Sequence, residues 1–129
     1  MKSPIEMVKK IPQVLLWGGN SLSRIFHDLM IKDGIGNPVI IFDDKISVPH
    51  YDSNAIFINN IDQLIDSIKL ISHFVVCIGS EHGYARYKTA EALQKLNLKP
   101  LSIIHKTSYT EISTKLGYGS IILQGAIIN

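Results

Sequence analysis

The sequence has few sulfur atoms, few arginines and no long apolar run, and each shortage excludes a class of protein. Among its 129 residues there is one cysteine, Cys77, so neither a disulfide framework nor a cysteine-based zinc site can form. The longest uncharged apolar stretch is about seven residues, whereas a membrane helix needs about 20. No apolar segment of the secretory-signal type follows the lysines near the amino terminus. We therefore expect a cytoplasmic protein with no membrane partner.

The basic residues are scattered along the chain. The formal net charge is +2, Arg24 and Arg86 are the arginines, and Lys9–Lys10 is the one adjacent lysine pair. Nucleic-acid binders concentrate their basic residues in a stripe or patch, so we expect no nucleic-acid partner. The apolar content of 46% is that of an ordinary globular core and excludes wholesale disorder.

Short apolar runs that end in glycine or polar turns alternate with segments of helical spacing. The predicted strands are 12–17, 38–42, 55–58, 73–78 and 100–104, and the predicted helices are about 21–34, 60–70 and 81–96. The alternation predicts βαβ units and an α/β, Rossmann-like three-layer fold with a five-stranded parallel sheet in the order 3-2-1-4-5. In the last helix the inward spacing falls on Tyr84, Tyr87, Ala90, Leu93 and Leu96. The strand order reverses between strands 1 and 4, and ligands of such sheets bind at that point.

The loop after the first strand is a candidate anion site. It contains Gly18, Gly19, Asn20, Ser21 and Ser23, and the amino terminus of the helix that follows would offer backbone N–H groups to a phosphate. The alternative is a tight turn that binds no ligand. The loop matches neither G-x-G-x-x-G nor the P-loop pattern, which disfavours NAD and ATP.

Two further loops should converge on the same edge of the sheet. Asp43, Asp44 and Lys45 follow the second strand, where an acidic residue often hydrogen-bonds a ribose; the alternative is a solvated turn in which one aspartate caps its own backbone. Gly79, Ser80 and His82 follow the fourth strand. Ser80 can cap the next helix, and His82 is either a ligand contact or a surface histidine.

The remaining titratable residues suggest no catalytic or metal centre. The histidines outside these loops have no partners at metal-ligand spacing, so we expect no metal. Cys77 lies among Val75, Val76 and Ile78, where a small buried hydrophobe is more common than a nucleophile. We assign no catalytic residue in this chain.

The pattern changes after Ile104. Leu116, Ile122 and Ile128 recur every six residues, and Thr114, Ser120 and Ala126 do so in a fixed phase to them. This hexapeptide pattern is typical of a parallel β-helix; the alternative is an irregular tail with chance periodicity. It predicts a Rossmann-like domain at 1–106 and the truncated first coil of a β-helix at 107–129. Since one coil cannot bury its own inner face, we expect the chain to be a fragment of a longer protein.

Four stretches resemble a known family: LLWGGNSLSR, VIIFDDK, VVCIGSEHGYAR and LSIIHKTSYTEIST followed by GYGSIILQGAIIN. They are similar to the amino-terminal part of bacterial sugar O- and N-acyltransferases of the sialic acid O-acetyltransferase family, which includes N-acetyltransferases of UDP-linked 4-amino sugars. In that family a Rossmann-like domain precedes a left-handed β-helix of hexapeptide repeats. The resemblance implies that a nucleotide-linked sugar, with a UDP-sugar foremost, binds at the three loops and Arg86.

The resemblance also implies what this chain does not supply. In the family, acetyl-CoA and the catalytic histidine belong to the β-helix further along, the full-length enzyme is a homotrimer, and the product enters surface polysaccharide. We therefore expect no cofactor in this chain and no acyltransferase activity from it alone.

This sequence departs from the family at two places, and two other functions stay open. Ser21 and Ser23 stand where the first-turn pattern G-x-x-G-x-G has glycines, and GSEHGYAR is longer than the corresponding family segment, which displaces Arg86. One alternative is a regulatory or redox-sensing dinucleotide-binding module without catalysis. The other is a protein-interaction domain that has lost ligand binding.

Overall fold

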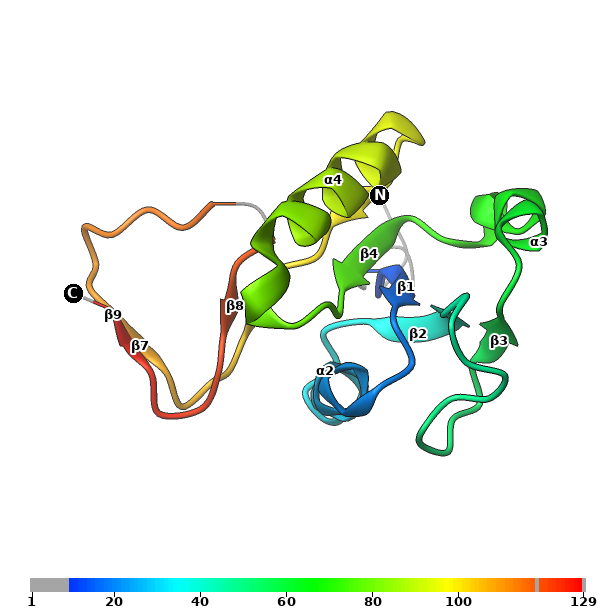
Figure 1. The fold of residues 1–129 in the computed structure, drawn as a ribbon. Helices are drawn as coiled ribbons and strands as arrows, with labels where there is room; N and C mark the ends of the chain where they lie inside the picture. Colours follow the sequence, from blue (N-terminus) through cyan, green and yellow to red (C-terminus); the bar gives the residue numbers. More distant parts are fainter. Residues whose placement is uncertain (1–9, 118, 129) are drawn as a thin grey trace, which may run out of the picture.

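The computed structural model describes residues 10–117 and 119–128, except for the side chain of Ser80. Its centre is a five-stranded sheet in the order β3-β2-β1-β4-β5 in which all neighbours pair in parallel, as the sequence predicted (Figure 1). The strands are β1 (Gln13–Trp17), β2 (Asn37–Phe42), β3 (Ile56–Ile58), β4 (His73–Val76) and β5 (Lys99–Pro100).

Helices cover both faces of this sheet, and side chains alternate between the two faces along each strand. Val14 and Leu16 of β1 pack against helix α2 (Ser21–Lys32), whereas Leu15 packs toward the opposite face. That face is covered by α3 (Ile61–Asp66), the short 3-10 helix η1 (Ile68–Leu70) and α4 (Gly83–Lys95). Figure 1 shows α2 and α4 on opposite sides of the strands. The sheet is therefore the middle of three layers, and its loops are held from both sides.

Helix α2 begins and ends where its sequence predicts. The side chain of Asn20 accepts a hydrogen bond from the backbone N–H of Ser23 and caps the amino terminus. At the other end Gly34 has a φ of +65°, and the N–H of Ile35 reaches back to the carbonyl of Met30 at 2.9 Å. This left-handed closure is the reason that a glycine follows the helix.

The other two predicted helices differ from their expected form. The 60–70 segment is divided at Ser67 into α3 and η1. The 81–96 segment begins with a 3-10 turn, η2 (Ser80–His82), before α4 starts. On α4, Leu93 is buried as expected, but Tyr84 and Tyr87 are exposed, at 77% and 63%. Their predicted inward placement was wrong: the helical spacing holds, but the first turns of α4 do not bury these two rings.

The predicted fifth strand at 100–104 is also two elements. Lys99 and Pro100 pair with β4, after which the chain leaves the sheet and Ile103–Ile104 form β6. The hydroxyl of Ser102 accepts hydrogen bonds from the backbone N–H groups of Gly119 and Ser120, at 3.0 and 3.3 Å. These bonds hold the chain against a segment that comes later in the sequence.

Beyond Pro100 the chain forms two small parallel pairs beside the sheet (Figure 1). Strand β6 (Ile103–Ile104) pairs with β8 (Ile121–Ile122), and β7 (Tyr109–Thr110) pairs with β9 (Ile127–Ile128). In both pairs each residue faces the one eighteen positions later, which is three times the spacing of the hexapeptide pattern. Ile122 is buried, but Leu116 is 39% exposed.

Candidate functional site

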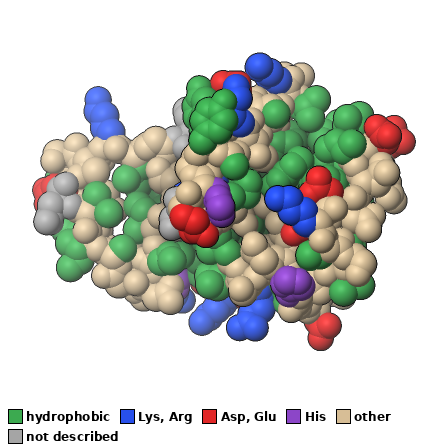
Figure 2. Space-filling view, viewed as in Figure 1, with side chains coloured by type: hydrophobic (Ala, Val, Ile, Leu, Met, Phe, Trp, Pro, Cys, Tyr) green, Lys and Arg blue, Asp and Glu red, His purple; other side chains and the backbone are tan. Residues whose placement is uncertain are grey.

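A cavity of about 330 Å³ lies at the carboxyl ends of β1, β2 and β4. This is the switch point of the sheet, where α/β folds bind ligands. In Figure 2 acidic, basic and histidine side chains gather in the middle of the face, around the ends of these strands. The cavity is lined by Trp17, Gly18, Asn20, Phe42, Asp43, Asp44, Lys45, Cys77, Ile78, Gly79, Glu81 and His82.

The first turn is shaped by its contact with the end of β4. Gly18 has a φ of +125°, and a Cβ atom there would lie 3.0 Å from the carbonyl oxygen of Cys77. The side-chain amide of Asn20 donates to the same carbonyl at 3.5 Å. A side chain at position 18 would therefore be strained and crowded, so glycine is required by the backbone.

Asp43 joins the first turn to the second. One carboxylate oxygen accepts a hydrogen bond from the N–H of Gly19 at 3.0 Å, and the other accepts one from the N–H of Lys45 at 3.0 Å. Asp43 therefore caps its own turn, as one interpretation of this loop predicted. It also holds the neighbouring first turn. Asp43 thus fixes the positions of the two loops relative to each other, and the side chains of Asp44 and Lys45 are exposed.

Ser23 lies differently from the other predicted site residues. It is 0% exposed, and its hydroxyl oxygen is 2.6 Å from the phenol oxygen of Tyr51. Burial raises the pKa of Tyr51 from 10.0 to about 12. Ser23 therefore faces the loop after β2 and does not line the cavity.

The third loop supplies the opposite wall. Gly79, Glu81 and His82 line the cavity, and Nε2 of His82 is 3.6 Å from the carboxylate of Glu81. Both of these side chains are well exposed, at 62% and 73%, so their pairing is weak. The N-cap of η2 is Gly79 and that of α4 is His82, so Ser80 is the first residue of η2 and not the predicted cap, and its side chain lies outside the described residues.

The walls combine aromatic surface with an excess of carboxylates. Trp17 and Phe42 contact each other with ring centroids 4.5 Å apart. Around them stand Asp43, Asp44 and Glu81, together with the cation Lys45. Such walls suit a flat ring and several hydroxyl groups, which donate hydrogen bonds to carboxylates. An anionic group is favoured near Lys45 and not elsewhere in the cavity.

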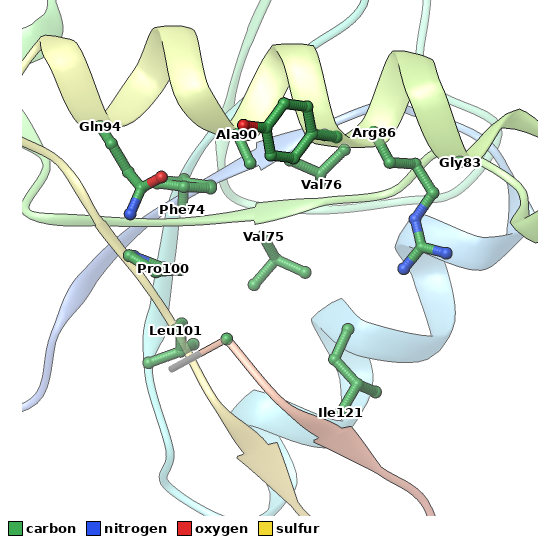
Figure 3. Close-up of a pocket in the computed structure, with 12 residues that line it drawn as sticks. Phe74, Val75, Val76, Gly83, Arg86, Ala90, Gln94, Pro100, Leu101 and Ile121 are labelled. Atoms are coloured by element: carbon green, nitrogen blue, oxygen red, sulfur yellow. The ribbon is translucent and has the colours of Figure 1, made fainter. Parts of the chain in front are cut away.

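Arg86 lines a different cavity. Its side chain extends from α4 into a space of about 330 Å³ between that helix, β4 and the segment around Ile121 (Figure 3). Besides Arg86, the lining of this cavity is largely apolar and includes Val75, Val76 and Leu101. The predicted site residues therefore lie in two places. Most of the loop residues meet at the switch point, whereas Arg86 lines the separate cavity beside α4.

Cys77 is buried, as its apolar neighbours in the sequence predicted. Burial raises the pKa of the Cys77 thiol to about 12, so it is a poor nucleophile. Burial and the nearby charge of Lys99 lower the pKa of His73. Within the described ranges no three of the histidine, cysteine and acidic side chains are grouped closely enough to hold a metal ion.

Sequence reasoning identified many of the residues that line this cavity, but not all of them. The structure brings together Gly18, Asn20, Asp43, Asp44, Lys45, Gly79 and His82. Gly19 lies beneath them, fully enclosed, and its carbonyl accepts from the N–H of His50 at 2.8 Å. Ser21 is exposed at the start of α2, outside the lining. Trp17, Phe42 and Ile78 were missed as lining residues, although their places at strand ends could have indicated them.

Comparison with known proteins gives a structural likeness without a detectable sequence relationship. No protein-family model matches the chain, and no curated protein matches it. PerB from Caulobacter crescentus, solved with CoA and GDP-perosamine, is similar with a TM-score of 0.72 and 19% identity over 93% of this chain and 55% of its own. The acetyltransferase domain of PglB from Neisseria gonorrhoeae, solved with acetyl coenzyme A, is similar with a TM-score of 0.73 and 17% identity over 92% and 56%.

The chain thus spans little more than half the length of the structures it resembles. No helix among residues 10–117 and 119–128 is long and apolar enough to cross a membrane. The expected likeness to sugar acyltransferases is confirmed at the level of the fold: over more than nine-tenths of its length, the chain has the fold of these acetyltransferase structures.

Proposed function

We propose that this chain is the acceptor-binding part of an acyl-CoA-dependent sugar acyltransferase, and that the cavity at the switch point binds a nucleotide-linked sugar. The observation that carries the proposal is the convergence of three polar loops at the carboxyl ends of β1, β2 and β4. The shared fold supports it, since PerB was solved with GDP-perosamine and CoA.

Within this site each group has a distinct role. The half-buried ring of Trp17 offers apolar area to a base or a sugar, and the buried ring of Phe42 packs against it. Asp44 accepts hydrogen bonds from ribose or sugar hydroxyls, and Lys45 meets the diphosphate. Asp43 holds the two loops in place, because each of its oxygens accepts a backbone N–H group, and the exposed Asp44 is the carboxylate that we assign to the ligand. The nucleotide is a uridine or guanosine diphosphate.

The carboxyl-terminal segment is the first coil of the left-handed β-helix in this proposal. Its support is the constant eighteen-residue offset of the two strand pairs, which corresponds to three hexapeptides in one turn of the coil. The coil would then begin at Ile103–Ile104, slightly before the predicted division at 1–106 and 107–129, because these residues already form the first of the two strand pairs. The catalytic base and the acetyl-CoA site would then belong to coils further along, in a cytoplasmic homotrimer that serves surface-glycan synthesis.

The acyl-transfer step needs a base that accepts a proton from the sugar amine or hydroxyl as it attacks the thioester. None of the described residues lining the switch-point cavity is placed as such a base, because Cys77 is protonated and buried and His82 pairs with Glu81 at the solvent boundary. The 129-residue chain should therefore bind acceptor without consuming acetyl-CoA. Turnover of acetyl-CoA with any amino-sugar nucleotide would contradict this division of labour.

Calorimetric titration with UDP-N-acetylglucosamine, GDP-mannose, a dTDP-sugar, NAD and CoA tests the proposed ligand class. We expect saturable binding of at least one sugar nucleotide and none of NAD or CoA. Lys45→Gln should weaken that binding, whereas the matched control Lys69→Gln, on exposed η1, should not. Binding of NAD alone would favour the redox-sensing module, and binding of none of the five would favour the interaction domain.

A further inference from the structure

A buried histidine on the α2 side of the sheet joins a serine and an aspartate that the proposed function does not use. His27, on α2, is 5% exposed. Its Nε2 is 2.7 Å from the hydroxyl oxygen of Ser53, and its Nδ1 is 2.8 Å from a carboxylate oxygen of Asp28. These are the contacts of a hydroxyl, a base and an orienting acid in serine acyl-transfer enzymes.

The neighbouring groups determine which nitrogen carries the proton. An ionised Asp28 carboxylate can only accept a hydrogen bond, so its partner Nδ1 must carry the N–H. Nε2 then presents a lone pair to Ser53. The hydroxyl oxygen of Ser53 also accepts the N–H of Ala55 at 2.9 Å, which leaves its own proton to be donated to Nε2. With a neutral imidazole, the contacts therefore set His27 as a base toward Ser53.

The imidazole ring is held on a second side as well. The ring of Tyr51 meets it edge-on with centroids 5.1 Å apart, and the phenol of Tyr51 is tied to Ser23 on the same helix. These contacts restrict rotation of the ring. A positioned base and hydroxyl lose little freedom on reaction, which is one of the main sources of rate in acyl transfer.

A cavity of about 540 Å³ opens directly on these groups. Besides His27 and Ser53 its lining includes apolar Ile31 and Pro38, the amides Asn37 and Asn54, and the carboxylate of Asp52. Asp52 disfavours an anionic substrate, so a CoA thioester is a poor candidate. The walls suit a neutral ester with a short acyl chain.

We propose that Ser53 is a nucleophile, with His27 as its general base and Asp28 as a positioning residue, in a second site that cleaves neutral short-chain acyl esters. The Ser53 oxygen bonds to the carbonyl carbon, its proton moves to Nε2 of His27, and the ester C–O bond breaks. The leaving alcohol or phenol takes the proton. Water then attacks the acyl-serine with His27 again as base, which releases the carboxylic acid and restores Ser53.

The chain contains a matched control for this arrangement. The hydroxyl oxygen of Ser72 is 2.8 Å from Nδ1 of His73. In the described part of the chain, no acidic side chain lies within hydrogen-bond distance of His73. Ser72→Ala therefore removes a serine–histidine pair that lacks the orienting acid. It should leave the reaction unchanged.

The test uses p-nitrophenyl acetate hydrolysis together with labelling by an uncharged fluorophosphonate, read by peptide mass spectrometry. We expect one adduct, on Ser53, and loss of both signals in Ser53→Ala. Asp28→Asn changes an exposed side chain and should not unfold the protein, yet it should slow labelling at least about tenfold because the wrong tautomer of His27 is then allowed. The inference is overturned if Ser53 is not labelled, if other serines are labelled equally, if Asp28→Asn reacts like the parent, or if Ser72→Ala loses the reaction.

Discussion

The carboxylate of Asp43 and the backbone N–H of Gly19 form a 3.0 Å hydrogen bond between the ends of β2 and β1. The second oxygen of Asp43 closes the turn to Lys45 at the same distance. One side chain thus fixes the relative position of two of the three loops that enclose the candidate site. Its contribution is to geometry, and the adjacent Asp44 is the carboxylate available to a ligand.

Asp43→Asn should lower the stability of the protein, whereas Asp44→Asn should weaken the binding of the sugar nucleotide. In Asp43→Asn the new NH₂ group faces one of the two backbone donors, and leaving that donor unsatisfied costs about 1–3 kcal/mol of stability. Asp44→Asn should leave the free energy of unfolding within about 0.5 kcal/mol but weaken sugar-nucleotide binding about fivefold, since a hydrogen bond to a neutral acceptor is weaker by about 1 kcal/mol. Urea unfolding and calorimetry measure the two effects. Equal stability of the two variants would show that the Asp43 bonds do not hold the loops.

Gly18→Ala should destabilise the protein more than Gly34→Ala. Both glycines have positive φ, at +125° and +65°, but a Cβ at Gly18 meets the Cys77 carbonyl at 3.0 Å while one at Gly34 meets nothing within 4 Å. We expect a loss of about 1 kcal/mol for Gly34→Ala and of about 2 kcal/mol or more for Gly18→Ala, where a clash adds to the strain. Urea midpoints compare the two, and a smaller loss at position 18 would refute the close approach of the first turn to β4.

Stability should fall in alkaline solution because of Cys77. Burial raises its pKa from 9.0 to about 12 in the folded protein, so the unfolded chain loses the thiol proton first. The full stability is present below pH 9.0 and is lost as pH rises toward about 12, with a slope of up to about 1.4 kcal/mol per pH unit. Cys77→Ala should flatten this slope between pH 9 and pH 10, whatever its effect at neutral pH. An unchanged slope in the variant would mean that the thiol is not the group responsible.

The carboxyl-terminal strand pairs should exchange their amide hydrogens faster than the sheet. Strands β7 and β9 have two residues each, and Tyr109 and Ile127 are exposed at 56% and 69%. Local opening there exposes few buried groups and costs little free energy. Hydrogen exchange resolved by mass spectrometry should show residues 109–128 exchanging well before β1 and β4. Equal protection in a monomer would contradict a single unsupported coil.

The sheet could be predicted from the sequence because its signals are local. Apolar runs that end in glycine or aspartate give the strands, and the spacing of Phe26 and Met30 gives the buried face of α2. The order of the strands follows from the alternation with helices. The same reasoning predicts that Gly18, Asp44 and His82 lie together, and all three line one cavity.

The features that could not be predicted depend on partners distant in sequence. The fifth strand breaks because Ser102 accepts hydrogen bonds from Gly119 and Ser120. The residues that flank Ser102 in the sequence do not indicate these bonds. The pairing of Ser53 with His27 spans twenty-six positions and required the fold. Tyr84 was misplaced because spacing identifies a helix face but not whether the sheet extends beneath it.

The central claim is that a sugar nucleotide occupies the cavity at the switch point. The most direct measurement is a titration of ¹⁵N-labelled protein with UDP-N-acetylglucosamine and GDP-mannose, followed by amide chemical shifts. The account predicts that the shifts of at least one ligand concentrate at Gly18–Asn20, Asp43–Lys45 and Gly79–His82. Shifts confined to the residues around Arg86, Pro100 and Gly119, or no shifts with either ligand, would contradict it.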